Sequence, residues 1–293
     1  MSERGYTIGP HAFTAPRPAP GLYVAATPIG NLRDVSLRVL ETLAGADRIA
    51  CEDTRQTARL LSRYGIKTPR VSYNEHNAVA RGPELLDAIA RGEAVALVSD
   101  AGTPLISDPG ARLVAEAVER GLPVFPLPGP AAPVAALVAS GLGGGAFTFL
   151  GFLPSKEGAR RDALEPYVGR PETLVLFESP HRLVASLKSM SEVLGAARRA
   201  VVAREITKMH ETHHRSTLGE LVVEFGAMER VRGEIVVTIE GAAPAADALD
   251  AEAVLRDLLS EHGAGRAAAE AARLTGRTRK ELYALALSLK DER

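Results

Sequence analysis

Several features are scarce in this 293-residue chain. Cys51 is its single cysteine, which excludes an internal disulfide and a cysteine metal cluster and favours a reducing, cytoplasmic compartment. No apolar run reaches the roughly 18 residues that a membrane helix needs. Residues 1–20 are rich in proline and lack an apolar core segment. They are therefore predicted to be a disordered arm and not a signal peptide.

Excess charge is also missing, because 35 basic residues nearly balance 36 acidic ones and leave a net charge of −1. Any binding to nucleic acid must then come from a local basic patch. Neither a Walker loop nor a GxGxxG loop follows a predicted strand, which argues against an ordinary nucleotide or dinucleotide site. The chain is long enough for two domains with cores of their own.

The first half alternates apolar, strand-like runs with amphipathic helical patterns. This alternation predicts a parallel sheet with helices on both faces, spanning residues 21–142. A glycine-rich break at 141–145 is the predicted boundary to a second α/β domain at 143–241 with a mixed sheet. In that domain, the polar run 211–216 is a candidate edge strand. The predicted strands of the first half are 22–27, 48–51, 71–73, 94–98 and 123–127.

The most informative stretch is 95–110, where a buried strand runs into a loop rich in glycine, proline and aspartate. Open α/β sheets bind ligands at the carboxyl ends of such strands. Gly102 allows a ligand to approach the backbone, Thr103 offers a hydroxyl and Asp100 offers a carboxylate. The alternative is a tight loop whose aspartate only caps the next helix.

Two further glycine–proline loops, at 27–32 and 127–132, follow predicted strands of the same sheet. Parallel topology places all three loops on one rim, where they can line one crevice. The loop at 127–132 enters a helix whose free backbone N–H groups suit a carboxylate. A ligand with a carboxylate, hydroxyls and a cationic centre would match this rim.

Polar clusters at other strand ends are a second candidate site, at 52–55, 75–77, 178–182 and 204–208. Each cluster alone is more often a helix cap or a surface ion pair, but together they favour a shared polar cleft. His76 and His181 have the chemistry of bases near neutral pH. Arginine and lysine side chains in these clusters are suited to gripping phosphate. The histidines at 210, 213 and 214 lack a convincing partner set, so no metal site is predicted.

The segment 242–293 follows an alanine-rich linker and contains three short helical patterns with a glycine turn, similar to a helix-turn-helix. Arg277, Arg279 and Lys280 belong to a basic cluster at residues 266–280, in which Glu270 is the single acidic residue. A charged, solvated face and a nucleic-acid contact are both compatible with this pattern.

Several motifs together resemble the family of small-subunit ribosomal RNA methyltransferases I, within the tetrapyrrole methylase-like class of S-adenosylmethionine enzymes. The resemblance runs from about residue 21 to 289 and excludes the proline-rich arm. These motifs are TPIGNL at 27–32, EDTR at 52–55, SDAGTP at 99–104, DPG at 108–110, PLPGP at 126–130, GFLP at 151–154 and ESPHR at 178–182. The resemblance that they carry implies two α/β domains with the cofactor in the cleft between them, and a cytoplasmic homodimer.

The resemblance also implies the reaction, which is methylation of the ribose 2′-hydroxyl of a cytidine in the decoding region of small-subunit rRNA. The assembled 30S particle is the expected form of the substrate. No membrane or metal partner is expected. A tetrapyrrole (precorrin) C-methyltransferase and a non-catalytic RNA-binding protein with a vestigial cofactor pocket are the alternatives. By motif position, the cofactor-binding residues are Pro28, Asp100, Gly102, Thr103, Pro104, Pro128, Gly129, Ala131 and Ala132.

The reaction needs a group that removes the proton of a ribose hydroxyl, and a general base contributes roughly 10²- to 10⁴-fold to such a step. The predicted catalytic residues are His76, Glu178 and His181. The predicted RNA-binding residues are Arg55, Arg182, Lys208, Arg277, Arg279 and Lys280.

Overall fold

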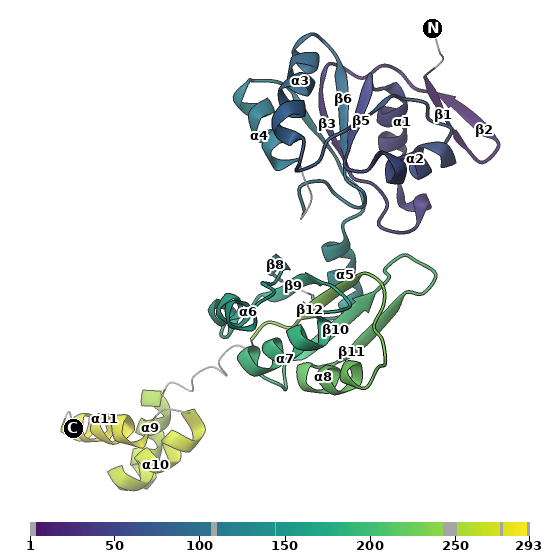
Figure 1. Ribbon diagram of the computed structural model, residues 1–293. Helices are drawn as coiled ribbons and strands as arrows, with labels where there is room; N and C mark the ends of the chain where they lie inside the picture. The colour runs from purple at the N-terminus through teal and green to yellow at the C-terminus, as the bar shows by residue number, and fades with distance from the viewer. Residues whose placement is uncertain (1–3, 107–109, 144, 243–250, 276–277, 292–293) are drawn as a thin grey trace. The chain divides into compact units, whose positions relative to one another are not determined.

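The computed structural model describes residues 4–106, 110–143, 145–242, 251–275 and 278–291 (Figure 1). It divides into two compact units. The larger unit comprises residues 1–165 and 173–240 and contains two five-stranded sheets. The smaller unit comprises residues 166–172 and 241–293 and contains the three C-terminal helices.

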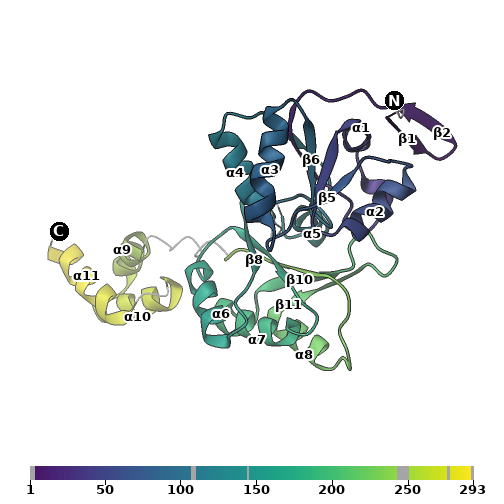
Figure 2. The same cartoon turned by 45° about the horizontal axis from the view of Figure 1, so that its top comes forward.

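The first sheet is parallel throughout, with the strand order β5-β4-β6-β3-β7. Its central strand β6 is buried at every residue, as the apolar run predicted. Helices cover both faces (Figures 1 and 2), which confirms the predicted fold class for this half. The strands are β3 (Gly21–Ala25), β4 (Arg48–Cys51), β5 (Arg70–Ser72), β6 (Ala94–Val98) and β7 (Val124–Leu127).

Alternate residues of β6 serve two separate cores because successive side chains of a strand point to opposite faces. Ala96 packs in the core that holds Leu43 of one helix layer, whereas Leu97 packs with Leu86 of the other. The first layer comprises α1 (Leu37–Gly45) and α2 (Thr54–Arg63), and the second comprises α3 (Ala78–Ala90) and α4 (Ala111–Glu119).

The N-terminal segment corrects one prediction, because residues 5–14 form a hairpin and not a disordered arm. Its strands β1 (Gly5–Ile8) and β2 (His11–Thr14) pair antiparallel. The hairpin is bound to the first sheet's unit through Thr7, whose N–H donates to the Tyr64 carbonyl at 2.8 Å. Arg4 and Arg17 both pair with Asp47, at 2.7 and 2.9 Å. These are tertiary contacts, which proline content does not report.

The second sheet is mixed, as predicted, with the order β11-β10-β12-β9-β8 and one parallel pair, β8 with β9. The polar run that was predicted to be an edge strand is β11, at the sheet's edge. The strands are β8 (Phe147–Phe152), β9 (Thr173–Glu178), β10 (Arg199–Arg204), β11 (Thr212–Thr217) and β12 (Ile235–Ile239).

Helix α5 (Ala132–Ser140) packs on the second sheet, although the predicted boundary at 141–145 assigned it to the first domain. Ala136 of α5 is buried against Val175, Ala203 and Val236 of three different strands. The helix is apolar on most sides, so it requires a sheet face to cover it. The crossover between the two sheets therefore lies before α5. The helices α6 (Glu157–Leu164), α7 (Leu183–Leu194) and α8 (Leu218–Gly226) complete this half.

The smaller unit has a core of its own, in which Leu255, Ala268 and Leu282 of three successive helices are buried together. These helices are α9 (Ala251–Glu261), α10 (Ala264–Thr275) and α11 (Arg279–Asp291), as the helical patterns predicted. Within the ranges that the structure describes, every helix is too short or too polar to cross a lipid bilayer.

Candidate active site

Three loops at the carboxyl edge of the first sheet are joined by hydrogen bonds. The backbone groups of Thr27 and Gly102 exchange two hydrogen bonds, at 2.8 and 3.0 Å. The Thr103 hydroxyl donates to the Pro130 carbonyl at 3.0 Å. Loops that are more than twenty residues apart in the chain are thereby held as one rim.

Gly102 is required at its position for two reasons. Its φ of +81° is a conformation that side chains rarely adopt, and an added Cβ would lie 3.3 Å from Cγ2 of Ile29. Gly129 of the third loop is constrained by close contact alone, because a Cβ there would lie 2.9 Å from the Cβ of Ala26. The glycines therefore set how closely the three loops approach one another.

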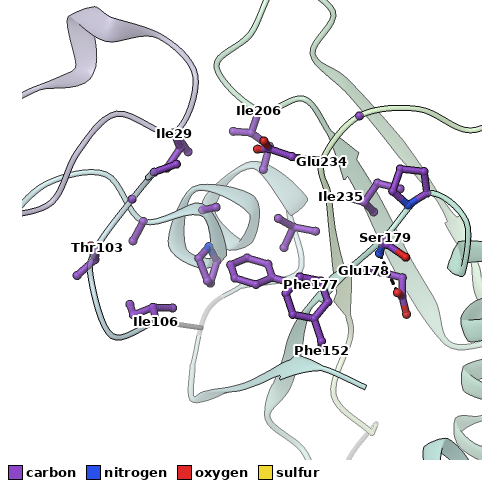
Figure 3. Close-up of a pocket in the computed structure, with 18 residues that line it drawn as sticks. Ile29, Thr103, Ile106, Phe152, Phe177, Glu178, Ser179, Ile206, Glu234 and Ile235 are labelled. Atoms are coloured by element: carbon purple, nitrogen blue, oxygen red, sulfur yellow. Dashed lines mark hydrogen bonds between the residues drawn. The ribbon is translucent and has the colours of Figure 1, made fainter. Parts of the chain in front are cut away.

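A cavity of about 380 Å³ lies beside this rim (Figure 3). Its other wall is formed by the carboxyl end of β9 and the amino end of β12. Its walls are mostly apolar side chains, and α5 begins at its edge with no side chain capping the N-terminus. The lining residues are Ile29, Ala101, Gly102, Thr103, Ile106, Ala131, Ala132, Pro133, Phe152, Phe177, Glu178, Ser179, Pro180, Ile206, Gly233, Glu234, Ile235 and Val236.

Two carboxylates line this cavity in different environments (Figure 3). The Glu178 side chain is 0% exposed, accepts hydrogen bonds from the Ser186 hydroxyl and the Ser179 N–H, and pairs with Arg182 at 3.4 Å. The Glu234 side chain is 73% exposed. Glu178 is therefore occupied by protein donors, whereas Glu234 is accessible to a ligand.

Lys208 lies between two carboxylates, with its Nζ 3.0 Å from Oε1 of Glu205 and 3.1 Å from Oε1 of Glu234. Burial alone would lower the pKa of Lys208, but the hydrogen bonds and charges of the two glutamates outweigh it and raise that pKa. The pKa of Glu205 is lowered, chiefly by the hydrogen bond from the Glu234 N–H and also by Lys208. Both shifts favour the charged forms, an ammonium ion at Lys208 and a carboxylate at Glu205.

The loop that carries Lys208 also contacts the first rim. The Thr207 hydroxyl accepts a hydrogen bond from the Asn31 N–H at 3.1 Å, and a Cβ on Gly30 would lie 2.6 Å from Cγ of Lys208. Both Glu205 and Thr207 have positive φ, at 52° and 67°. Backbone strain of this kind persists where the surrounding contacts hold it. The two sheets are thus connected directly beside the cavity.

The chain is similar along most of its length to ribosomal RNA small subunit methyltransferase I of several bacteria. The relative from Mesorhizobium japonicum is 51% identical over 273 residues, which cover 93% of this chain and 93% of the relative. The chain belongs to the ribosomal RNA small subunit methyltransferase I family. The member from Escherichia coli O157:H7 is 45% identical and covers 91% of this chain and 94% of its own length.

Two family models agree with this membership. Residues 21–222 match the tetrapyrrole (corrin/porphyrin) methylases, and residues 245–290 match the RsmI C-terminal HTH domain. Among solved structures, the methyltransferase CobJ is similar in fold, with a TM-score of 0.58 and 24% identity, covering 76% of this chain and 95% of CobJ. The predicted family, the α/β fold and the helix-turn-helix-like C-terminal segment are confirmed.

The structure brings together part of the predicted cofactor-binding set of this family member. Gly102, Thr103, Ala131 and Ala132 line the cavity. The other members of the set lie in the same loops but outside the lining. Among these, Asp100 accepts a hydrogen bond from the Asp53 N–H at 3.0 Å, so its carboxylate connects two loops. The remaining four are Pro28, Pro104, Pro128 and Gly129.

The predicted catalytic set is not brought together. His76 and His181 are exposed, and neither lines the cavity. Glu178 does line it, but its carboxylate is engaged by Ser186, Ser179 and Arg182. Sequence reasoning missed Glu234, because this residue is 56 positions away from Glu178 and only the pairing of β9 with β12 brings the two strand ends together.

The predicted RNA-binding residues lie in four places. Arg55 is 91% exposed at the start of α2, Arg182 donates to the Leu153 and Pro154 carbonyls, and Lys208 lies in the glutamate cluster. Arg279 and Lys280 are exposed at the start of α11. The sixth prediction, Arg277, lies outside the described residues.

Two of the three histidines at 210, 213 and 214 lie in β11 and have carboxylate partners. His213 Nε2 lies 2.7 Å from Glu211 Oε1, and His214 Nδ1 lies 2.6 Å from Glu224 Oε1. Within the described ranges, no group of three or more histidine, cysteine, aspartate or glutamate side chains is arranged to hold a metal ion.

Proposed function

We propose that this protein transfers a methyl group from S-adenosylmethionine to the ribose 2′-hydroxyl of a cytidine in the decoding region of small-subunit rRNA. The observation that carries the proposal is a cavity lined on one side by the hydrogen-bonded loops and on the other by an accessible carboxylate. The chain is also 51% identical to a relative named ribosomal RNA small subunit methyltransferase I. The proposed substrate is the assembled 30S particle, and the proposed form is a cytoplasmic homodimer.

The cavity fits the proposed cofactor by chemistry and size. Ligand pockets of roughly 300–1,000 Å³ with apolar walls and a few polar groups are typical for small molecules. Ile29, Ile106 and Pro133 supply apolar walls. The uncapped N-terminus of α5 suits the carboxylate of an amino acid, because its first N–H groups lack intrahelical partners.

When bound, S-adenosylmethionine supplies an electrophilic methyl group, so positioning provides a large part of the catalysis. Holding two reactants in line is worth on the order of 7–11 kcal/mol. In this chain the hydrogen-bonded loops around Gly102 and Thr103 provide a rigid seat for one reactant.

The proposal assigns proton removal to Glu234, and not to His76, His181 or Glu178. Glu234 has the more exposed of the two carboxylates that line the cavity, at 73% against 0%. Lys208 holds that carboxylate at 3.1 Å and thereby orients it. The Glu234 carboxylate belongs to the cavity wall opposite the rim. We place the incoming ribose hydroxyl beside this carboxylate.

The C-terminal helices are proposed to contact rRNA through the basic start of α11, where Arg279 and Lys280 are exposed. Contacts of this kind position a protein on the phosphate backbone and provide little sequence readout. The particle itself would then present the target nucleotide.

The decisive experiment is transfer of a radiolabelled methyl group to 30S particles that lack small-subunit ribose methylation, followed by mapping of the labelled nucleotide. The expected result is one labelled 2′-O-methylcytidine in the decoding region. Label on a base, label elsewhere in the rRNA, or transfer to a precorrin with none to the particle would contradict the proposal.

A further inference from the structure

Helix α2 has an unusual outer surface. Its three arginines, Arg55, Arg59 and Arg63, are spaced four residues apart, and α2 (Thr54–Arg63) contains no acidic residue. Residues four apart lie on the same side of a helix, so the three form one stripe. All three side chains are exposed, and the opposite side of α2 buries Leu60 and Leu61 in the core.

The outer part of the stripe carries positive charge without acidic partners, unlike the paired arginines of several other helices. Arg55 pairs only with Asp53, the cap of its own helix, at 3.4 Å, and no described residue forms an ion pair with Arg59 or Arg63. A solvated helix face usually carries charges of both signs. On other helices, the arginines with carboxylate partners are Arg81, Arg112, Arg120, Arg161 and Arg256.

The stripe begins beside the candidate active site. Asp53 caps α2, and its N–H donates to Asp100 in the loop that contains Gly102. Arg55 is therefore the arginine nearest to that loop, and Arg63 is the farthest. A helix rises 1.5 Å per residue, so the arginines are about 6 Å apart along the axis and the stripe extends over about 12 Å.

We propose that Arg55, Arg59 and Arg63, the α2 stripe, bind successive phosphates of the rRNA strand whose ribose enters the cavity. This inference rests on the proposed function and adds a docking surface to it. The net charge of −1 gives the protein no general attraction to RNA, so binding requires a local cationic surface such as this stripe. Arginine suits phosphate because its planar fork donates two parallel hydrogen bonds.

The test is the double variant Arg59→Gln/Arg63→Gln, which removes two charges and preserves helix propensity. The matched control is Arg91→Gln/Arg120→Gln. These two exposed arginines end α3 and α4, just before β6 and β7 begin, and so lie at the opposite edge of the sheet. Both variants are expected to bind S-adenosylhomocysteine as the unmodified protein does.

Binding to a decoding-region rRNA fragment is measured between 50 and 300 mM salt. The slope of log affinity against log salt is expected to fall by about one per arginine lost, hence by about two in the stripe variant and not in the control. With 30S particles as substrate, KM is expected to rise about tenfold while kcat stays within about twofold, because the change acts on backbone contacts.

A stripe variant with the salt slope and KM of the control would overturn the inference. The outcome for the proposed function is separate, because that proposal fails only if the unmodified protein does not methylate 30S particles. In that case the salt slope on the rRNA fragment still decides whether α2 binds RNA.

Discussion

The two sheets of the larger unit contribute differently to the cavity. The parallel sheet provides backbone, because its three loops are held by main-chain hydrogen bonds, by the Thr103 hydroxyl and by glycines in close contact. The mixed sheet provides charge, because Glu178 and Glu234 lie at strand ends and Lys208 lies in a loop between strands. In the proposed reaction, the parallel sheet would seat the cofactor and the mixed sheet would act on the acceptor.

This comparison has a topological basis. Parallel strands all end at the same edge, so their loops gather there without further design. In the mixed sheet β9 and β12 run in opposite directions, so the end of one strand meets the start of the other. Glu178, the last residue of β9, is paired with Ile235, the first residue of β12. Glu234 directly precedes Ile235, so the two glutamates come from neighbouring strand ends.

The largest expected effect on methyl transfer is that of Glu234→Gln. Loss of a general base should lower kcat by about 10²- to 10⁴-fold, while affinity for S-adenosylhomocysteine, measured by calorimetry, stays the same. Glu240→Gln is the matched control because Glu240 follows the other end of the same strand β12. Retention of kcat in Glu234→Gln would remove this residue from the proposed chemistry.

Gly102→Ala should give the opposite pattern. A side chain at φ +81° and 3.3 Å from Ile29 strains the rim by about 1–3 kcal/mol. We expect affinity for S-adenosylhomocysteine to fall about tenfold, with kcat at saturating cofactor reduced less. The control is Gly92→Ala, because Gly92 has a φ of +93° but an added Cβ there would contact no other part of the protein within 4 Å. Equal cofactor affinity of both variants would contradict the proposal that the loops of the parallel sheet bind the cofactor.

Glu178→Gln should affect stability more than chemistry. Its carboxylate accepts from Ser186 and Ser179 and pairs with Arg182, so neutralising it leaves buried donors poorly matched. We expect the free energy of unfolding to fall by about 1–3 kcal/mol in urea titration, with kcat within about twofold at low temperature. A loss of kcat as large as that of Glu234→Gln would instead make Glu178 the catalytic carboxylate.

The smallest effect on methyl transfer is expected for substitution of Asp47. This residue directly precedes β4, at the edge of the parallel sheet opposite to the three loops of the rim. Burial opposes its ionisation, but hydrogen bonds from Arg17, the Ala94 N–H and Arg4 outweigh burial and lower the pKa of Asp47 from 3.8 to about 2. A depressed carboxyl pKa stabilises the fold above the unfolded value and loses this stabilisation as pH falls from about 4 to 2.

We expect unfolding experiments over that pH range to show a loss of at most about 2 kcal/mol, because solvent screens part of the interaction. Asp47→Asn should abolish this part of the acid dependence and release the N-terminal hairpin to proteases. Asp87→Asn is the control, because the pair of Asp87 with Arg120 is exposed and contributes little. An unchanged acid dependence in Asp47→Asn would show that the hairpin is held by other contacts.

Much of the rim could be predicted from the sequence, because glycine and proline at strand ends report local backbone requirements. Gly102 is an example, since its positive φ and its close approach to Ile29 both demand glycine. The opposing wall could not be predicted in the same way. Glu234 carries no local signal, and its exposure depends on strand pairing and on Lys208.

The hairpin at residues 5–14 and the position of α5 illustrate the same limit. Proline content suggested disorder, yet Thr7 and Asp47 provide contacts that hold the hairpin in place. The glycine-rich break suggested a boundary, yet α5 packs on the sheet that follows it. In both segments, contacts between residues distant in sequence outweighed local composition.

The sequence by itself determined the alternating α/β pattern, the buried strand β6, the three loops and the family. These features follow from periodicity and from residues whose backbone preferences are local. Only the tertiary structure decided which carboxylate is accessible, that Lys208 is held between Glu205 and Glu234, and that Arg59 and Arg63 of α2 form no ion pair with a described residue. The physical reason is that burial and charge pairing depend on neighbours that the chain brings together only when it folds.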